Sequence, residues 1–311
     1  MSEILCVIDG MTDPGFRADN YHNLSRMRLK KYIQTVPNGY EAESLTCILT
    51  LLEISPIPMN IRAYVEALGA GIPVGKNDLV FRGSWVSIDN SGNCSSLTYA
   101  PNIIRRETDS IEYHSLGRYK SIILLKDMAD KLKNVETHAP YRCLGQPVET
   151  LLPDGIPELT QFIKHCSTKK RILIPWGQGR SVVIPPYQKK TTVICGTDIV
   201  RGIAKILGME IIIVTGATGD TDTDLTAKAL AALRAAEDSP FVFLHINGAD
   251  EAAHRRDAKT KMAFLQNVDK NVLALLIKSD HIIRVVSDHG TNPENGIHIG
   301  EKQPMYEKIK I

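Results

Sequence analysis

The sequence predicts an α/β fold, a three-layer α/β/α sandwich with a mostly parallel sheet, and a smaller α+β unit in the middle of the chain. Two observations predict it. Short apolar runs alternate with amphipathic helical segments towards both ends of the chain, as in parallel sheets covered by helices on both faces. After "PVGKND" the pattern changes, and strand-like runs follow one another with turn-forming residues between them.

The N-terminal third begins with a buried strand and two helices. "ILCVID" is a short apolar run that ends in Asp9 and is followed by Gly10, as expected for a strand that enters a loop. "SLTCILTLLEI" has apolar residues at helical spacing and begins at Ser44, whose hydroxyl can cap free backbone N–H groups. "NIRAYVEALGAGI" predicts a second helix, closed by Gly69 and Gly71.

The middle of the chain has the features of a separate small unit. "LVFRGSWVSID", "IEYHSL" and "YKSIILL" are predicted strands, separated by "NSGN" and "YAPN". The unit ends near "PWGQGRSVVIPPYQKK", whose proline and glycine content predicts a linker.

The C-terminal part returns to alternating strands and helices. The predicted elements are, in order, the strand "TTVICG", the helix "TDIVRGIAKILGM", the segment "EIIIVTGATGD", the helix "TDLTAKALAALRAAE", the strand "FVFLHING", the helix "KTKMAFLQNVDKNVLALLIKS" and the strand "HIIRVVSDHG".

The overall composition is that of an ordinary soluble globular protein. The 311-residue chain is 43% hydrophobic and 23% charged, with a net charge of +2. Because this balance does not attract a polyanion strongly, we expect neither nucleic acid nor a membrane as a partner. The N-terminal segment has no basic region before its short apolar run, and no apolar span reaches about 18 residues, so we expect neither export nor membrane insertion. The six cysteines are scattered without a CxxC pair, which favours a reduced, cytoplasmic compartment.

Three apolar runs each deliver an aspartate just beyond their C-terminal end. Asp9 follows "ILCVI", Asp250 follows "FVFLHINGA" and Asp288 follows "IIRVVS". A single aspartate in such a place is usually a turn or cap residue. Ligands of open α/β sheets bind at the edge where the strands end, so three aspartates accompanied by histidines predict a functional site there.

Histidines accompany two of these aspartates. His289 follows Asp288 directly, and His298 comes after a turn-rich segment. Asp250 and His254 are four residues apart, and on a helix they would lie on one face with Cβ atoms about 5–6 Å apart. An isolated pair of this kind is usually a surface pair. Carboxylates together with neutral imidazoles suit Mn²⁺ or Zn²⁺ better than Ca²⁺ or Mg²⁺.

Ser44 has two interpretations. As the first residue of a helix it can act as a plain cap, or it can hold a phosphoryl group against exposed N–H groups. A metal ion beside it would favour the second interpretation, because coordination lowers the hydroxyl pKa and makes an alkoxide nucleophile available.

Together these segments resemble the archaeal-type, cofactor-independent phosphoglycerate mutases of the alkaline phosphatase superfamily. The resemblance covers most of the chain and rests on the order and joint presence of its motifs. These are "VIDGMTDPG", "ESLTCILTLL", "YVEALGAGIPV", "LVFRGSWVSID", "LGQPVETLLP", "PWGQGR", "VTGATGDTDTDLTAKALAAL", "FVFLHINGADEAAHRRDAKTKMAFLQNVD" and "SDHGT" with the later histidine.

The resemblance implies two divalent ions and a phosphoserine intermediate. Ser44 would be the nucleophile that takes phosphate from 3-phosphoglycerate and returns it to the other hydroxyl of glycerate, without bisphosphoglycerate or a nucleotide. The implied ligands of the two ions, Mn²⁺ or Zn²⁺, are Asp9, Ser44, Asp288 and His289 for one, and Asp250, His254 and His298 for the other. The metal-binding phosphotransfer domain would be 1–75 with 187–311, split by a substrate-binding domain, 76–186.

The inserted segment departs from the family pattern. An arginine-rich element and the helix after it are replaced by "NSGNCSSLTYAPN". The positions left as candidates for substrate binding are Asp78, Arg82, Lys120, Arg142 and Arg180. Arginine forks bind carboxylate and phosphate bidentately and lysine does not, so these changes affect which phosphorylated molecule is held.

Three functions therefore stay open. The first is the mutase reaction on a small phosphorylated metabolite. The second is a phosphohydrolase or a homoserine kinase-like phosphotransferase, because a smaller lid shields an intermediate from water less well. The third is a non-catalytic metal-binding or regulatory protein. The sequence leaves the oligomeric state, the metal and the general acid or base open.

Overall fold

The computed structural model describes residues 1–100, 109–140 and 143–309, and the chain divides into two compact units. The first unit is Met1–Ile57 with Ile184–Ile311, and the second unit is Pro58–Val183. The inserted domain is predicted from the sequence to start at residue 76, whereas the second unit starts earlier, at Pro58. The reason is that helix α2 (Arg62–Gly69) packs on strands β3 (Leu79–Ile88) and β7 (Arg171–Gly179) of that unit.

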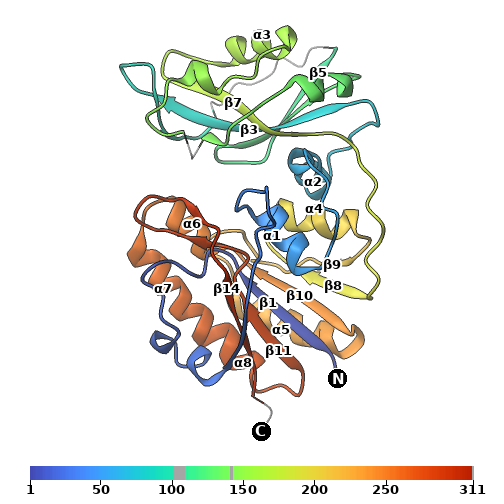
Figure 1. Ribbon diagram of the computed structural model, residues 1–311, viewed down its shortest axis with the longest axis vertical. Helices are drawn as coiled ribbons and strands as arrows, with labels where there is room; N and C mark the ends of the chain where they lie inside the picture. The colour runs from blue at the N-terminus through green and yellow to red at the C-terminus, as the bar shows by residue number, and fades with distance from the viewer. Residues whose placement is uncertain (101–108, 141–142, 310–311) are drawn as a thin grey trace. The chain divides into compact units, whose positions relative to one another are not determined.

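The first unit contains the mostly parallel sheet that the sequence predicts. Within its described residues the sheet has seven strands in the order β2-β14-β11-β1-β10-β8-β9 (Figure 1). The neighbouring strands β11, β1, β10, β8 and β9 are parallel to one another. At one edge, β14 pairs antiparallel with β11 and with β2. The strands are β1 Glu3–Ile8, β2 Arg28–Ile33, β8 Thr191–Ile194, β9 Glu210–Ile212, β10 Phe241–Ile246, β11 Ile282–Val286 and β14 Gln303–Glu307.

Helices cover both faces of this sheet, which completes the predicted three layers (Figure 1). On one face, alternate residues of β1 and β10 form a single apolar core with side chains of α5 and α7. On the other face α1 and α4 pack together. The helices of this unit are α1 Ser44–Leu51, α4 Asp198–Ile206, α5 Leu225–Asp238, α6 Gly248–His254, α7 Ala258–Val268 and α8 Ala274–Leu276, with short 3-10 turns at Ala18–Asn20 and Leu24–Arg26.

Strands β2 and β14 are absent from the sequence prediction. β2 has the sequence "RLKKYI", and its first five residues are exposed, so the alternation that marks a half-buried strand is missing. Charged residues of this kind are typical of edge strands, where they discourage pairing with another chain.

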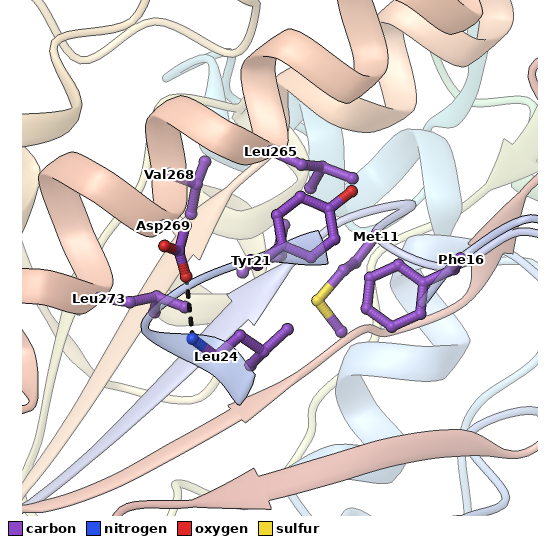
Figure 2. A pocket seen from close by; sticks show the side chains of 9 residues that line it. Met11, Phe16, Tyr21, Leu24, Leu265, Val268, Asp269 and Leu273 are labelled. Atoms are coloured by element: carbon purple, nitrogen blue, oxygen red, sulfur yellow. Dashed lines mark hydrogen bonds between the residues drawn. The ribbon is translucent and has the colours of Figure 1, made fainter. Parts of the chain in front are cut away.

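The predicted helix after residue 258 is interrupted by a π-helical turn at Asp269–Leu273, between α7 and α8. The Asp269 carboxylate accepts hydrogen bonds from the backbone N–H groups of Asn23 and Leu24, at 3.0 and 2.9 Å. Figure 2 shows the bond to Leu24 beside a small apolar cavity of about 10 Å³. Asp269 thus fastens the segment that follows β1 to this turn.

The second unit is an antiparallel sheet with helices. Its strands run in the order β4-β3-β6-β5, and β7 pairs with the free side of β3. The segment "PWGQG" lies within β7, so the linker predicted there begins only after Gly179. Pro175 is tolerated because, among the described strands, β7 pairs only with β3 and is therefore an edge strand. The remaining elements are β4 Cys94–Leu97, β5 Ile111–Ser115, β6 Lys120–Leu125, α3 Pro157–Cys166 and the 3-10 helices Ala129–Asn134 and Val148–Leu151.

All six cysteines lie in the described part of the chain, and none of them forms a disulfide there. Among the described residues, no helix combines the length and the apolar character that crossing a membrane requires.

Candidate metal centre

The three aspartates meet at one edge of the first unit's sheet. β11, β1 and β10 are neighbouring parallel strands, with Val7 beside Val286 and Ile8 beside Ile246. Asp9 follows β1 directly, Asp288 comes two residues after β11, and Asp250 lies in α6, just beyond β10. Because parallel strands end at the same edge, residues far apart in the sequence converge here.

Gly10 permits a close approach between the end of β1 and α6. Its φ is +65°, and a Cβ atom added to it would lie 2.8 Å from the Asp250 Cα and 2.8 Å from the Thr291 Oγ1. A residue with a side chain would therefore push the end of β1 away from α6. The Ser287 hydroxyl also ties the strand ends together, since it donates to the Ile8 carbonyl and accepts from the Met11 N–H.

The first group of ligand atoms surrounds the Ser44 hydroxyl. Ser44 Oγ is 3.3 Å from Asp9 Oδ2 and 3.4 Å from His289 Nε2. His289 Nε2 in turn lies 3.5 Å from Asp9 Oδ1 and 3.6 Å from Asp288 Oδ2. All four residues are buried, and Asp9, Asp288 and His289 form a cluster with metal-binding geometry.

The second group lies beside the first. His254 Nε2 is 3.2 Å from Asp250 Oδ2, and His298 Nε2 is 3.5 Å from Asp250 Oδ1. The two Nε2 atoms are 3.0 Å apart. The His289 ring stacks on the His298 ring with 3.9 Å between centroids, and Asp250, His289 and His298 also form a cluster with metal-binding geometry. The helix α6 places Asp250 and His254 on one face, as their spacing predicts.

Backbone carbonyls orient all three histidine rings. The Nδ1 atoms of His254, His298 and His289 lie 2.8, 2.7 and 3.2 Å from the carbonyl oxygens of Gly296, Ala42 and Gly290. A carbonyl oxygen only accepts, so each Nδ1 carries the proton. The Nε2 lone pairs therefore point into the cluster, as in metal-ligating histidines whose other nitrogen is hydrogen-bonded.

Burial and like charge raise the pKa values of two carboxyl groups. Burial raises the pKa of Asp9 well above its ordinary value, and the charges of Asp288 and Asp250 add to the effect. Burial also raises the pKa of Asp288. Asp9 Oδ1 and Asp288 Oδ2 accept no hydrogen bond from the residues that the structure describes. Both observations indicate that a positive charge belongs beside these oxygens.

The pKa values of His289 and His254 are shifted in opposite directions. Burial lowers the pKa of His289 well below its ordinary value, and the neighbouring His298 lowers it further. Burial alone would lower the pKa of His254 as well, but the Asp250 carboxylate outweighs it and the pKa of His254 is raised. Reciprocally, His254 and His298 hold the pKa of Asp250 well below its ordinary value, against the effect of burial.

The spacing of these atoms fits metal coordination. Ligand atoms about 2.1 Å from a tetrahedral ion lie about 3.4 Å from one another. The oxygen and nitrogen distances within the two groups run from 3.0 to 3.6 Å. With nitrogen and oxygen donors and no thiolate, the chemistry suits a divalent cation.

The structure also reveals site residues that sequence reasoning missed. Thr291 Oγ1 donates to Asp250 Oδ1 at 2.7 Å, and His245 on β10 lies 3.4 Å from Asp9. Thr291 stands in "SDHGT" and His245 is the single polar residue of "FVFLHI". A polar residue in an otherwise apolar strand next to an aspartate motif is the signal that could have found His245.

The residues predicted to bind substrate lie in the second unit, except Arg142, which is outside the described residues. Arg82 is buried and its guanidinium pairs with Glu66 of α2. Asp78 accepts from the N–H groups of Gly75 and Asp127, at 2.6 and 3.1 Å. Lys120 is half-buried at the start of β6, and Arg180 is exposed just after β7. Their role in binding stays a prediction.

A buried cluster of carboxylates and imidazoles at the carboxyl edge of a parallel sheet defines a metal-dependent protein. A family model described as the metalloenzyme superfamily matches residues 16–306, and the chain belongs to this superfamily.

Among individual proteins, the chain is 27% identical to the 2,3-bisphosphoglycerate-independent phosphoglycerate mutase 2 of Methanothermobacter thermautotrophicus, over 98% of this chain and 88% of the relative. It is 26% identical to the 2,3-bisphosphoglycerate-independent phosphoglycerate mutase of Methanococcus aeolicus, with the same coverage. The resemblance seen in the sequence motifs is therefore confirmed.

Solved structures share the fold. A protein of Pyrococcus horikoshii designated PH0037 aligns with a TM-score of 0.71 and 20% identity, over 99% of this chain and 87% of that protein. The cofactor-independent phosphoglycerate mutase of Thermoplasma acidophilum aligns with a TM-score of 0.53 and 16% identity, over 99% and 89%. Together with the sheet order, these alignments confirm the α/β fold class.

Proposed function

We propose that the protein is a two-metal phosphotransferase that interconverts 3-phosphoglycerate and 2-phosphoglycerate through a phosphorylated Ser44. The observation that carries the proposal is the position of the Ser44 Oγ, within 3.4 Å of both Asp9 and His289 and therefore among the first group of ligand atoms. A serine at the start of α1 that served only as a cap would not need two ionisable partners.

The ligand assignment follows the two groups. Asp9, Ser44, Asp288 and His289 would hold one ion, and Asp250, His254 and His298 the other. Bound Mn²⁺ or Zn²⁺ would lower the pKa of the serine hydroxyl and neutralise charge on a phosphoryl group. Asp9 accepts from the Ser44 hydroxyl and thereby fixes the direction of Oγ. Ser44 is the first residue of α1, and the free backbone N–H groups in the first turn of a helix favour an anion.

The named relatives supply the reaction. Two archaeal relatives that align with nearly the whole chain are named as phosphoglycerate mutases. For this chain the proposed substrate is accordingly a small phosphorylated hydroxy acid. The first unit is proposed as the metal-binding phosphotransfer domain and the second unit as the substrate-binding domain, with Asp78, Arg82, Lys120, Arg142 and Arg180 as candidate contacts.

One observation favours a second function. The buried guanidinium of Arg82 is committed to Glu66, and the sequence lacks the arginine-rich element usual at this place. A substrate domain with fewer available guanidinium groups would hold glycerate less firmly during transfer. The alternative is therefore a phosphohydrolase, or a homoserine kinase-like transferase, that uses the same Ser44.

Phosphorus NMR of the reaction mixture separates these functions. Incubation with 3-phosphoglycerate and Mn²⁺ is expected to give 2-phosphoglycerate for the mutase, and inorganic phosphate for a hydrolase. If neither product forms, even at a protein concentration equal to that of the substrate, both functions are ruled out for this substrate. Ser44→Ala is expected to abolish turnover while both ions stay bound, because three or more ligands remain for each ion. Undiminished turnover by this variant would refute the nucleophile.

Mass spectrometry tests the intermediate itself. Acid quenching during turnover should leave a phosphate on the peptide that contains Ser44. A matched control is Ser25→Ala, which removes an exposed hydroxyl whose bond is to the local His22 carbonyl. This control should keep full turnover and the same phosphopeptide.

A further inference from the structure

His245 occupies an unusual place for a histidine. It lies on β10, paired with Val7 of β1, and its side chain has no exposed surface. Its ring is nearly parallel to the Phe243 ring, at an angle of 7° and a centroid distance of 6.4 Å. A phenylalanine or leucine would fill such an apolar position without burying polar atoms.

The polar atoms of this ring are poorly satisfied. Neither Nδ1 nor Nε2 makes a hydrogen bond of good geometry to any residue that the structure describes. The fully buried imidazole carries at least one N–H, whatever its protonation state. A buried N–H without a partner is costly, which implies that an acceptor completes this site.

The Asp9 carboxylate can supply this acceptor. Its Oδ2 lies 3.4 Å from His245 Nε2, just past the end of the neighbouring strand β1. Its other oxygen, Oδ1, lies 3.5 Å from His289 Nε2 and accepts no hydrogen bond from the described residues. Asp9 Oδ2 therefore faces His245 and also accepts from the Ser44 hydroxyl, whereas Oδ1 faces His289.

We infer that His245 is a positioning residue for the metal centre: its Nε2–H donates to Asp9 Oδ2 and leaves Oδ1 to bind the ion. The inference rests on the proposed metal centre. Ligating carboxylates are themselves hydrogen-bonded, and such partners hold the ligand at the geometry that the ion requires. We assign His245 a positioning role and not a ligand role, since it lies outside both clusters of candidate ligands found among the described residues.

The sharpest test is a pair of substitutions of equal length. His245→Gln keeps an N–H donor near the position of Nε2, and His245→Met removes it. Equilibrium dialysis against Mn²⁺ alone, with metal counted by mass spectrometry, gives the affinity for each ion without any substrate. We expect His245→Met to bind one of the two ions about 10–100-fold more weakly, and His245→Gln to bind both ions as the wild type does.

Two further variants separate positioning from packing. Phe243→Leu removes the ring beside His245 and should lower the melting temperature while both ions stay tightly bound. Asp9→Asn should weaken the same ion as His245→Met, and the double variant should bind it no more weakly than Asp9→Asn alone, because His245 acts through Asp9.

Clear results would overturn the inference. It fails if folded His245→Met binds both ions as tightly as the wild type, or if His245→Gln is as impaired as His245→Met. If neither variant folds, nitrogen–proton NMR of the wild type decides, since a proton on Nδ1 in place of Nε2 overturns it. If the wild type itself binds no Mn²⁺, the proposed metal centre falls as well, which is a different outcome from loss of the positioning role alone.

Discussion

His254 and His298 face each other through their Nε2 atoms, which are 3.0 Å apart. Each ring donates from Nδ1 to a backbone carbonyl, so neither can turn away. Two lone pairs at this distance need a cation between them, either a proton or a metal ion. The raised pKa of His254, caused by Asp250 in spite of burial, indicates that a proton takes this place when no ion is bound.

Metal binding should therefore release a proton from this pair. Because the pKa of His254 lies above its ordinary value of about 6.5, a competing proton weakens metal binding at and below neutral pH. We expect the affinity for Mn²⁺ at this site to fall about tenfold per pH unit below that pKa. Titration with a chelator of known affinity at pH 6, 7 and 8 measures the effect.

The control for this prediction is His22→Gln, which changes an exposed histidine and should leave the pH dependence unchanged. An affinity that stays constant between pH 6 and 8 would contradict the proposed exchange of a proton for a metal ion.

Lys228 provides a second pH-dependent test, in the core of the first unit. It lies on α5 with no exposed surface, and its Nζ is 3.4 Å from the Thr218 carbonyl. Burial lowers its pKa to about 8, although nearby Cys195 and Cys6 oppose the shift. Between this pKa and the unfolded value of about 10.4, the unfolded chain binds the additional proton. Stability should therefore rise with pH across that window.

Lys228→Met isolates this contribution, because the variant keeps the same cysteines and differs only in the titrating amine. We expect the wild type to gain roughly 3 kcal/mol relative to Lys228→Met between pH 8 and 10.5. Urea unfolding followed by circular dichroism gives both free energies. A difference that does not change over this range would mean that Lys228 is not buried as a neutral amine.

The sequence could predict where the aspartates converge because strand ends are easy to recognise. Asp9 and Asp288 each follow an apolar run, and parallel strands bring such positions to one edge. What the sequence does not contain is the direction of each side chain. Whether His245 points towards Asp9 or into another layer depends on the register of β1 and β10, and register comes from packing between distant segments.

The same reasoning explains the features that were missed or misplaced. β14 is short, and β2 is largely exposed, so neither has a pattern of its own. The π-helical turn is invisible to helical periodicity, because "NVDKNVLALL" continues the apolar spacing through it. The placement of α2 in the second unit depends on its packing against β3, β6 and β7, which the sequence pattern does not contain.

Asp269 in the π-helical turn yields a stability prediction. Its buried carboxylate accepts from Leu24 N–H and from both the backbone and the side-chain amide of Asn23. Asp269→Ala leaves these buried donors without an acceptor, so we expect a loss of about 2–3 kcal/mol in the free energy of unfolding.

Hydrogen exchange identifies the origin of this loss. The N–H groups of Asn23 and Leu24 should lose protection in Asp269→Ala even under conditions where the sheet stays protected. Asp238→Ala, at an exposed position, is the matched control and should change stability by less than about 0.5 kcal/mol. Equal losses in the two variants would show that Asp269 does not fasten the segment after β1.

The second unit contains a buried ion pair between α2 and the sheet. Glu66 pairs with Arg82 and lies 3.5 Å from Arg62, and both guanidinium groups lie over the Trp176 ring, at 5.7 and 4.9 Å. Burial alone would raise the pKa of Glu66, but Arg82 and Arg62 outweigh it and the pKa is lowered. Glu66 is thus the charge that allows Arg82 to be buried.

Glu66→Gln should therefore destabilise the second unit by about 3 kcal/mol at pH 7, because it leaves Arg82 buried without a counter-charge. The greater free energy of unfolding of the wild type, relative to Glu66→Gln, is present above the unfolded pKa of about 4.3. It is lost as pH falls through the lowered pKa of Glu66 in the folded state.

Both tryptophans, Trp85 and Trp176, lie in this unit, so fluorescence during denaturant unfolding reports on it directly. Glu112→Gln, which breaks the more exposed pair with Lys126, should cost at most about 1 kcal/mol. A similar loss in both variants at pH 7 would contradict the role given to burial.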